Sequence, residues 1–343
     1  MEPVVVDTSR GIAFDSRWVR RVLLSPERAE SGLAEHVLAA GAGRDYVIAT
    51  SDAWLRHVIA QRNTLDEASR AVLHPSSSVL ETCLDKAKFA AWCGSRGVPS
   101  PRTWLVGHQP RPKELAPPFL VRPANTLHTA VASGLPKAVE AGTEAELEKW
   151  LRAFAERHCP AVVSESLLHE SLTQFSVPFV RTPDAFEVFV ARKSRPAAKH
   201  CSVGSYVELT AQPELEQLAR RVAEGLDYFG IGEAEVLRID ATGQLFLIEV
   251  NARPWLQYAL APASGHDFLG TLLGRPRPMR RIKDGRRWIN FESDLFVAFS
   301  SSIGAVRRGE LGFRSYLKSL LRANVYARFD LRDPLPALRR LER

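Results

Sequence analysis

The sequence predicts an α/β fold in which a parallel unit precedes a region that contains antiparallel strands. Short apolar segments alternate with helical stretches over residues 1–82, which is typical of βαβ units on a parallel sheet. Between residues 83 and 275 a hairpin signal at 233–251 indicates antiparallel pairing, and helical periodicity dominates residues 276–343. We therefore predict an N-terminal α/β domain, a central α+β domain and a C-terminal helical region with these bounds.

The N-terminal region contains two strand signals and three helix signals. The strands are residues 3–7 (PVVVD) and 45–52 (DYVIATSD), and the helices are residues 32–42, 53–63 and 65–73. A dinucleotide-binding βαβ unit uses a G-x-G-x-x-G turn so that the backbone can approach the pyrophosphate. The sequence has no such turn here, so this domain gives no sign of binding a dinucleotide.

Caps and turn residues divide the strands from the helices in the central region. Gly97 closes an amphipathic helix that begins near Glu81, because glycine suits the position after a helix. Thr143 lies three residues before Glu146 and is a candidate helix N-cap. The remaining signals are strands at 161–171 and 186–196, a helix at 213–229 and helices within 292–326.

Charge and cysteine usage narrow the class of protein. The net charge of +7 and pI near 9.4 allow an anionic partner, but the basic residues are spread along the chain and no nucleic-acid-binding motif is present. We therefore do not expect nucleic acid as a partner. The four cysteines form no C-x-x-C pair, so we expect buried thiols at Cys83, Cys93, Cys159 and Cys201 rather than a disulfide framework or a zinc site.

The apolar segments argue against a membrane protein. The N-terminus shows no basic segment followed by a long apolar one, and no eighteen apolar residues run together. We expect a cytoplasmic protein with no membrane partner.

The hairpin at 233–251 aligns oxygen ligands on one face. If Ala241 to Gly243 form a three-residue loop, Glu235 lies directly opposite Glu249, and Asn251 follows on the same face. Facing carboxylates repel unless a cation lies between them. Mg²⁺ prefers such oxygen ligands, so Glu235, Glu249 and Asn251 form a predicted Mg²⁺ site, with Mn²⁺ as an alternative ion. The competing interpretation is an exposed hairpin end whose acidic residues face water.

The order of these motifs resembles that of the ATP-grasp superfamily, and within it the predicted carboxylate-amine ligases with a carbamoyl-phosphate-synthetase-like ATP-binding domain. The resemblance covers residues 81 to 267. It rests on Asp85-Lys86 before a helix, Arg122-Pro123 at a strand end, the segment VVSESLL and the EVNAR strand. It implies a two-subdomain core with antiparallel sheets, whose lid subdomain spans about residues 119–192.

The resemblance also assigns residues to ATP. Lys86 and Arg122 take the positions of phosphate ligands, although the family usually has lysine where this chain has Arg122. Glu165 and the backbone near Ser166 and Leu167 take the places that contact adenine. The family's glycine-rich phosphate loop is replaced here by a segment with only Gly134, in which Ser133 and Lys137 are the other polar candidates.

The segment FVARKSRP resembles the strand whose basic residues face the triphosphate. Lys193 and Arg195 are two residues apart, so regular alternation places both on one strand face. Arg253 lies two residues beyond Asn251 and adds a guanidinium for a phosphate or a carboxylate. We assign Arg253, Arg195 and Lys193 to catalysis and Lys193 also to ATP binding. Trp255, Gln257 and Tyr258 are candidate substrate contacts, and Trp255 is equally compatible with a role in packing.

The resemblance implies an ATP-dependent carboxylate-amine ligase. Such an enzyme forms an acyl phosphate from a carboxylate and ATP, and an amine then displaces phosphate to give an amide or peptide bond. The expected partners are a small-molecule carboxylate and an amine, with an amino acid favoured, and a homodimer is left open. The alternatives are an ATP-grasp kinase that phosphorylates a hydroxyl, a basic nucleic-acid-binding protein and a non-catalytic nucleotide-binding subunit.

Overall fold

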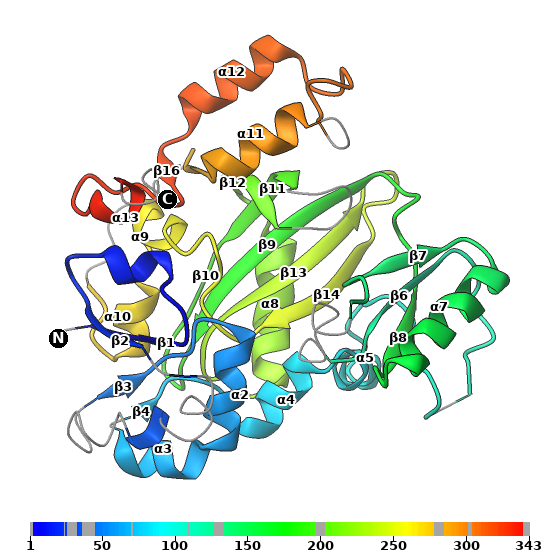
Figure 1. Ribbon diagram of the computed structural model, residues 1–343, viewed down its shortest axis with the longest axis horizontal. Helices are drawn as coiled ribbons and strands as arrows, with labels where there is room; N and C mark the ends of the chain where they lie inside the picture. The colour runs from blue at the N-terminus through cyan, green and yellow to red at the C-terminus, as the bar shows by residue number, and fades with distance from the viewer. Residues whose placement is uncertain are drawn as a thin grey trace.

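Two antiparallel sheets form the centre of the molecule in the computed structural model (Figure 1). The structure describes residues 3–23, 25, 33–35, 45–69, 71–108, 110–125, 134–196, 203–277, 285–300 and 304–338. The N-terminal elements lie on one side of the large sheet and the small sheet lies on the other, while two C-terminal helices project beyond the strands.

The N-terminal region contains parallel strand pairs, as predicted, but they form two separate sheets. β1 (Val4–Asp7) pairs with β2 (Arg20–Leu23), and β3 (Tyr46–Val47) pairs with β4 (Ala71–Val72). The helices are η1 (Ile12–Asp15), α2 (Asp52–Ala60) and α3 (Arg62–Ala68). The predicted helix at 32–42 lies mostly outside the described residues.

The large sheet has the strand order β14-β13-β9-β11-β12-β15-β16, with β10 paired to β9. All of its pairs are antiparallel except β15 with β16. The strands are β9 (Leu172–Arg181), β10 (Phe186–Val188), β11 (Val190–Pro196), β12 (Gly204–Thr210), β13 (Gly230–Ile239), β14 (Leu245–Asn251), β15 (Arg287–Ile289) and β16 (Val325–Tyr326).

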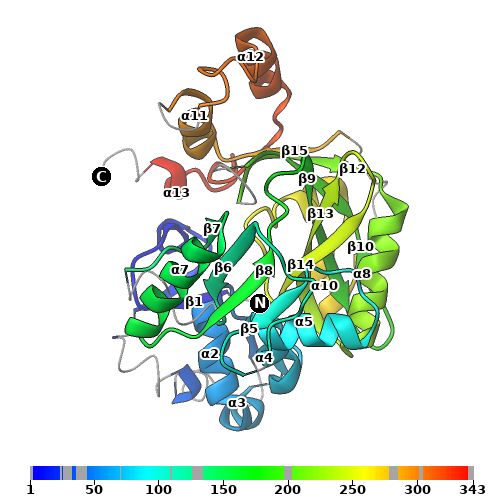
Figure 2. The ribbon, with the colours of Figure 1, turned by 90° about the vertical axis from the view of Figure 1, so that its right-hand side faces the viewer.

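The small sheet has the order β5-β8-β6-β7 and is covered by α7 (Figure 2). Its strands are β5 (Thr103–Leu105), β6 (Phe119–Pro123), β7 (Val139–Ala141) and β8 (Ala161–Glu165), and α7 is Glu144–Glu156. Thr143 caps α7 as predicted, because its hydroxyl accepts the Glu146 N–H at 3.2 Å. The expected lid range, 119–192, differs from this unit, since it omits β5 and includes β9 and β10 of the large sheet.

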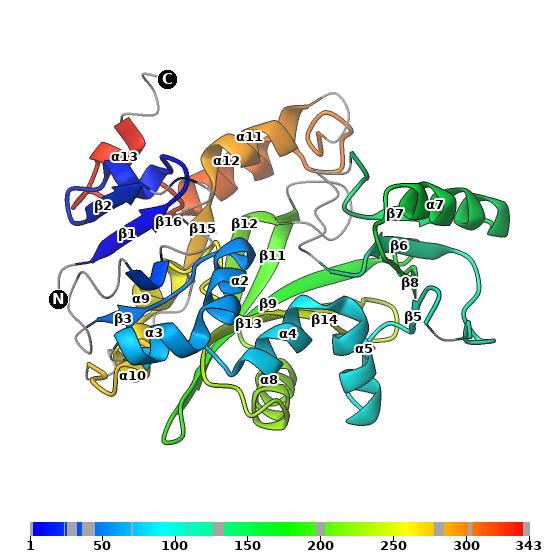
Figure 3. The same cartoon turned by 60° about the horizontal axis from the view of Figure 1, so that its bottom comes forward.

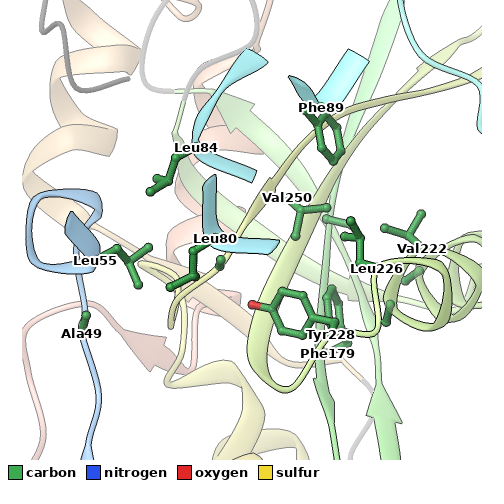
Figure 4. Packing of buried hydrophobic residues seen from close by; sticks show 14 of the residues in the cluster. Ala49, Leu55, Leu80, Leu84, Phe89, Phe179, Val222, Leu226, Tyr228 and Val250 are labelled. Carbon is green, nitrogen blue, oxygen red and sulfur yellow. The ribbon is translucent and has the colours of Figure 1, made fainter. Parts of the chain in front are cut away.

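Helices cover one face of the large sheet and form the main core (Figures 3 and 4). They are α4 (Ser77–Leu84), α5 (Lys86–Ser95) and α8 (Pro213–Gly225). Leu80 of α4 and Val222 of α8 pack in the same cluster as Phe179 and Val250 of the strands. Because side chains alternate along a strand, the residues between these apolar positions face the opposite side of the sheet.

The C-terminal region is not purely helical, because β15 and β16 extend the large sheet. A strand of two or three residues is too short to produce a periodic signal, and the sequence therefore predicted helix alone. The helices of this region are α11 (Phe291–Phe299), α12 (Phe313–Arg322) and α13 (Leu335–Leu338), and they follow α9 (Leu260–Ser264) and α10 (Phe268–Leu272) of the central region. Within the described residues, no helix has the length and apolar character needed to cross a membrane.

Candidate active site

The β13–β14 hairpin aligns Glu235 with Glu249, as predicted, but by another route. Ile239 N–H donates to the Gln244 carbonyl at 2.9 Å, so the loop has one residue more than expected. A β-bulge then absorbs Ile248, because Val236 pairs with Leu247 and Glu235 with Glu249. Gly243 adopts φ +73°, the left-handed conformation expected of it.

Glu233 joins this face and was missed by the sequence analysis. It pairs with Asn251 in the ladder and is 3% exposed. Asn251 Nδ2 donates to Glu233 Oε2 at 3.0 Å and lies 3.3 Å from Glu235 Oε1, while the Ser176 hydroxyl donates to the other oxygen of Glu233. The signal was present in the sequence, since Glu233 precedes Glu235 by two residues and alternation places both on one face.

Lys193 of β11 lies among the carboxylates of Glu233, Glu235 and Glu249, which together with Asn251 form the carboxylate cluster. Its Nζ lies 2.9 Å from Glu235 Oε2, and its side chain is 3% exposed. Burial lowers the pKa of Lys193, but the nearby carboxylates of Glu235, Glu233 and Glu249 raise it, and the net shift is upward. Lys193 therefore stays an ammonium group inside the protein.

Neighbouring cations compensate only part of the negative charge of Glu233 and Glu249. Burial raises the pKa of Glu233 to about 7, and burial followed by the charge of Glu235 raises the pKa of Glu249. Lys86, Arg122 and Lys193 act in the opposite direction on Glu249. Buried facing carboxylates of this kind gain stability from a cation between them.

The oxygen ligands fit a hard divalent cation. Glu235, Glu249 and Asn251 present carboxylate and amide oxygens, which Mg²⁺ prefers. No group of three or more acidic, histidine or cysteine side chains within the described residues could hold a metal ion on its own. The candidate site therefore consists of two carboxylates and one amide.

Lys86 and Arg122 reach the same centre from two other elements. Lys86 is the first residue of α5, whose N-cap Asp85 accepts the N–H groups of Ala87 and Lys88 at 2.9 and 3.0 Å. Burial, followed by the charge of Arg122, lowers the pKa of Lys86, while Glu249 raises it. Arg122 extends from β6 of the small sheet and donates to the Ser164 hydroxyl at 3.1 Å. The two sheets and α5 thus bring three basic residues toward Glu249.

Arg253 connects the cluster to the N-terminal domain. Its Nε donates to Asp52 Oδ1 at 2.6 Å, and its Nη2 donates to Asn251 Oδ1 at 3.4 Å. Burial lowers the pKa of Arg253, but Asp52 and then Glu233 and Glu249 raise it to a net upward shift. Asp52 is the first residue of α2 and was not predicted from the sequence, because no local pattern relates it to a residue 201 positions away.

His74 connects the N-terminal domain to Ala252, the residue that follows β14. Its Nε2 accepts the Ala49 N–H at 2.6 Å, and its Nδ1 lies 3.2 Å from the Ala252 carbonyl. Because Nε2 accepts, the proton of the neutral ring is on Nδ1 and is donated to Ala252. Burial lowers the pKa of His74 to about 4, which keeps the ring neutral.

Arg195 does not join the cluster, contrary to the prediction. Lys193 pairs with Val207 and Arg195 with Tyr206, and a bulge at Ser194 separates them. Since Tyr206 and Val207 are neighbours along β12, Arg195 and Lys193 point to opposite faces. The guanidinium of Arg195 bonds Asp294 of α11 at 2.7 and 2.9 Å and Ser319 of α12 at 3.0 Å.

The end of β8 holds the residues that the resemblance assigns to adenine. The carboxylate of Glu165 accepts the Arg102 N–H at 2.8 Å and pairs with the Arg102 guanidinium at 2.7 Å. Ser166 N–H donates to the Pro118 carbonyl at 2.9 Å, and Leu167 begins a turn closed by Glu170 N–H. The carboxylate of Glu165 is therefore already engaged by Arg102, and its part in adenine binding stays a prediction.

The remaining candidates fall into three groups. Ser133 lies outside the described residues, so the expected phosphate loop has no structural account beyond Gly134 and Lys137. Trp255 is 3% exposed and packs edge to face on Phe189 at 5.9 Å, which identifies it as a packing residue. Gln257 is buried and Tyr258 half-buried in the same region.

The cysteines offer no activated nucleophile within the described residues. Burial raises the pKa of Cys83 to about 12 and that of Cys93 to about 11, so both stay protonated thiols. Cys159 is buried, and Cys201 lies outside the described residues.

Comparison with known proteins identifies relatives by fold. No protein-family model matches the chain, and no curated protein matches it in sequence. An L-amino acid ligase from Bacillus licheniformis superposes with a TM-score of 0.63 at 15% identity, over 84% of this chain and 72% of that one. An N5-carboxyaminoimidazole synthetase from Staphylococcus aureus, complexed with ADP, gives 0.61 at 12% identity, over 83% and 73%.

A biotin carboxylase from Campylobacter jejuni, in complex with an ATP analogue, also gives a TM-score of 0.61, at 15% identity and over 83% of this chain and 74% of that one. Identities this low establish the fold alone. The fold predicted from the motif order is therefore similar to the fold of these three enzymes.

Proposed function

We propose that this chain, whose fold is that of the ATP-grasp superfamily, is an ATP-dependent carboxylate-amine ligase that releases ADP and phosphate. The observation that supports this function best is the convergence of Glu235, Glu249 and Asn251 with the cations Lys86 and Lys193. A nucleoside triphosphate with its metal ion requires acidic side chains that hold the ion and basic side chains that bind the phosphates.

Glu235, Glu249 and Asn251 would hold Mg²⁺, with Mn²⁺ as an alternative. When bound, the ion neutralises phosphate charge and so favours attack on the γ-phosphorus. Glu233 accepts the amide hydrogen of Asn251 and so holds the Asn251 side chain beside the carboxylates. Hydrogen bonds of this kind fix the position of a ligand side chain in a metal site.

Lys86, Arg122 and Lys193 would bind the phosphates. Arg122 belongs to the small sheet and Lys193 to the large one, so phosphate binding draws the two sheets together. The strand end at Glu165, Ser166 and Leu167 would contact adenine, with the backbone of Ser166 and Leu167 as the hydrogen-bonding edge. Closure of the small sheet over the nucleotide excludes water from a hydrolysable intermediate.

Arg253 would bind the substrate carboxylate beside the γ-phosphate. A carboxylate oxygen attacks the γ-phosphorus, the bond to ADP breaks, and an acyl phosphate forms. An amine then attacks the acyl carbon and phosphate leaves, which gives an amide. Neither step needs a nucleophilic side chain, in agreement with the protonated state of Cys83 and Cys93.

Asp52 of the N-terminal domain also contributes a carboxylate to this site. Its carboxylate pairs with Arg253 at 2.6 Å, and both side chains are about one-fifth exposed. The carboxylate of an amino acid would take the place of Asp52 at Arg253, and its ammonium group would take the place of Arg253 at Asp52. The fold similarity to an L-amino acid ligase supports the same substrate class. The division into domains at residues 82 and 275, a cytoplasmic location and a homodimer remain parts of the proposal.

A substrate screen tests the function. ADP release from Mg-ATP would be measured across a matrix of carboxylic acids and amino acids, and the products would be weighed by mass spectrometry. The Glu249→Gln variant, purified identically, measures contaminating ATPase. We expect turnover that requires both a carboxylate and an amine, with a product one water lighter than their sum. A phosphorylated product would identify a kinase, and absence of ATP binding would reject both activities.

A further inference from the structure

The outer face of α11 and α12 is apolar and exposed. The two helices lie side by side beyond the large sheet (Figures 1 and 3), with the Phe299 ring packed edge to face against Tyr316 at 5.3 Å. Phe299 also lies edge to face with Phe313 at 6.4 Å, and large apolar side chains of both helices stay exposed, among which Leu321 is 87% exposed. The exposed apolar residues of the pair are Phe291, Leu295, Phe296, Phe299, Phe313, Leu317 and Leu321.

α12 has three distinct sides. Tyr316 and Leu320 face the body of the protein, where Arg195 lies over the Tyr316 ring. The exposed residues Phe313, Leu317 and Leu321 are spaced four apart and form one outer stripe. A second exposed stripe follows one residue later along the helix and consists of the basic residues Arg314, Lys318 and Arg322.

Arg314, Lys318 and Arg322 form no ion pair with a carboxylate of the described residues. Each acidic residue in the described part of 285–338 already accepts a hydrogen bond from another group: Glu292 from Arg328, Asp294 from Arg195, Glu310 from Arg308, Asp330 from the Arg332 N–H and Asp333 from Ser16. A second copy that docked through the same face would bring a second basic stripe against the first. Charge complementarity therefore favours an anionic partner over a second copy.

The shape of the face favours a flat partner. A protein that surrounded α12 would need the side that faces the body, where Leu320 packs against Tyr206 of β12 and Ile289 of β15. An apolar stripe with phenylalanine and leucine, bordered by lysine and arginine, is the arrangement of helices that lie in the headgroup region of a bilayer.

We propose that the α11–α12 face docks on a membrane surface that contains anionic lipids. The apolar side chains enter the boundary between headgroups and acyl chains, and Arg314, Lys318 and Arg322 contact the lipid phosphates. The helices lie on the membrane and do not cross it. This inference does not depend on the ligase function, because none of these residues belongs to the candidate active site.

Vesicle sedimentation tests the proposal with the full chain. Vesicles of phosphatidylcholine alone would be compared with vesicles of equal parts phosphatidylcholine and phosphatidylglycerol. We expect binding to the mixed vesicles only, and we expect the Leu317→Asp/Leu321→Asp and Lys318→Glu/Arg322→Glu variants to bind at least about tenfold more weakly. Leu331→Asp is the matched control, since Leu331 is 85% exposed but lies between β16 and α13, and it should bind like the parent.

Each other outcome overturns the proposal. Equal binding to both kinds of vesicle would show that the basic stripe has no role. Absence of binding to either, with circular dichroism showing a folded protein, would exclude a membrane partner. A dimer in light scattering that the Leu317→Asp/Leu321→Asp variant dissociates, without vesicle binding by the parent, would identify a second copy as the occupant.

Discussion

The strands β14 and β11 each carry a β-bulge, and the two bulges have opposite effects on prediction. In β14 the extra residue Ile248 compensates for a loop that is one residue longer than expected, so that Glu249 still faces Glu235. In β11 the extra residue Ser194 interrupts the alternation, so that Arg195 faces away from Lys193.

Alternation along a strand predicts which face a side chain takes only between irregularities. A bulge adds one residue to one strand, which shifts every later side chain relative to the partner strand. Glu249 was placed correctly because two deviations cancelled. Arg195 was misplaced because only one deviation lies between it and Lys193. The consequence is that Glu249 faces Glu235, whereas Arg195 bonds Asp294 of α11 and Ser319 of α12.

The largest expected effect is at Glu249. We expect Glu249→Gln to reduce Mg-dependent ATP turnover to background while the protein stays folded, since glutamine keeps the size of the side chain and removes one ligand charge. Steady-state ADP release and thermal melting would measure both. Glu208→Gln is the matched control, because Glu208 pairs with Arg192 and Arg287 outside the cluster. Turnover by Glu249→Gln equal to that of Glu208→Gln would refute the metal assignment.

Arg195 provides the opposite test. Arg195→Met should lower the free energy of unfolding by about 3 to 5 kcal/mol, because it leaves the buried carboxylate of Asp294 unpaired. ATP turnover per folded molecule should be unchanged. Arg192→Met, on the same strand with a side chain 53% exposed, should cost less than about 1 kcal/mol. Urea unfolding of both variants would decide, and a stable Arg195→Met protein with lost turnover would return Arg195 to the active site.

The lowered pKa of His74, which lies between the N-terminal domain and β14, makes the free energy of unfolding depend on pH. Its pKa falls from 6.5 to about 4 on folding, so the unfolded chain binds a proton that the folded protein excludes. The stabilisation is complete above pH 6.5 and is lost as the pH falls toward 4, by up to about 3 kcal/mol. The slope of unfolding free energy against pH should flatten in His74→Gln and persist in the exposed-site control His108→Gln. Parallel slopes in both variants would contradict this.

The smallest effect is expected at Glu233, which bonds Asn251 but is not assigned as a metal ligand. Glu233→Gln replaces the acceptor for Asn251 Nδ2 with a group that can turn a donor toward it. We expect the Mg²⁺ concentration for half-maximal turnover to rise about tenfold, as is usual for loss of a group that orients a ligand. An unchanged Mg²⁺ dependence would leave Glu233 with a purely structural role.

Membrane association illustrates a different limit of sequence analysis. The expectation of no membrane partner rested on the search for long apolar segments, which concerns helices that cross a bilayer. A helix that lies on a bilayer needs only an apolar stripe beside a basic one. Whether Phe313, Leu317 and Leu321 form such a stripe or face the core depends on which side of α12 packs against the body.

Short-range patterns in the sequence specify several local features. The N-cap at Thr143 and the left-handed Gly243 follow from such patterns, and the pairing of Glu235 with Glu249 was predicted because the longer loop and the bulge cancel. These features depend on residues within about one hairpin of each other, where sterics and alternation act directly.

Which residues far apart in the sequence come into contact depends on the packing of the elements. Asp52 reaches Arg253, Asp294 binds Arg195, and Arg122 approaches Glu249 from another sheet. Such contacts depend on how whole elements pack, and packing responds to bulges and to faces that no local pattern specifies. The sequence therefore identified most of the candidate ligands, and the packing of the elements selected which of them share one site.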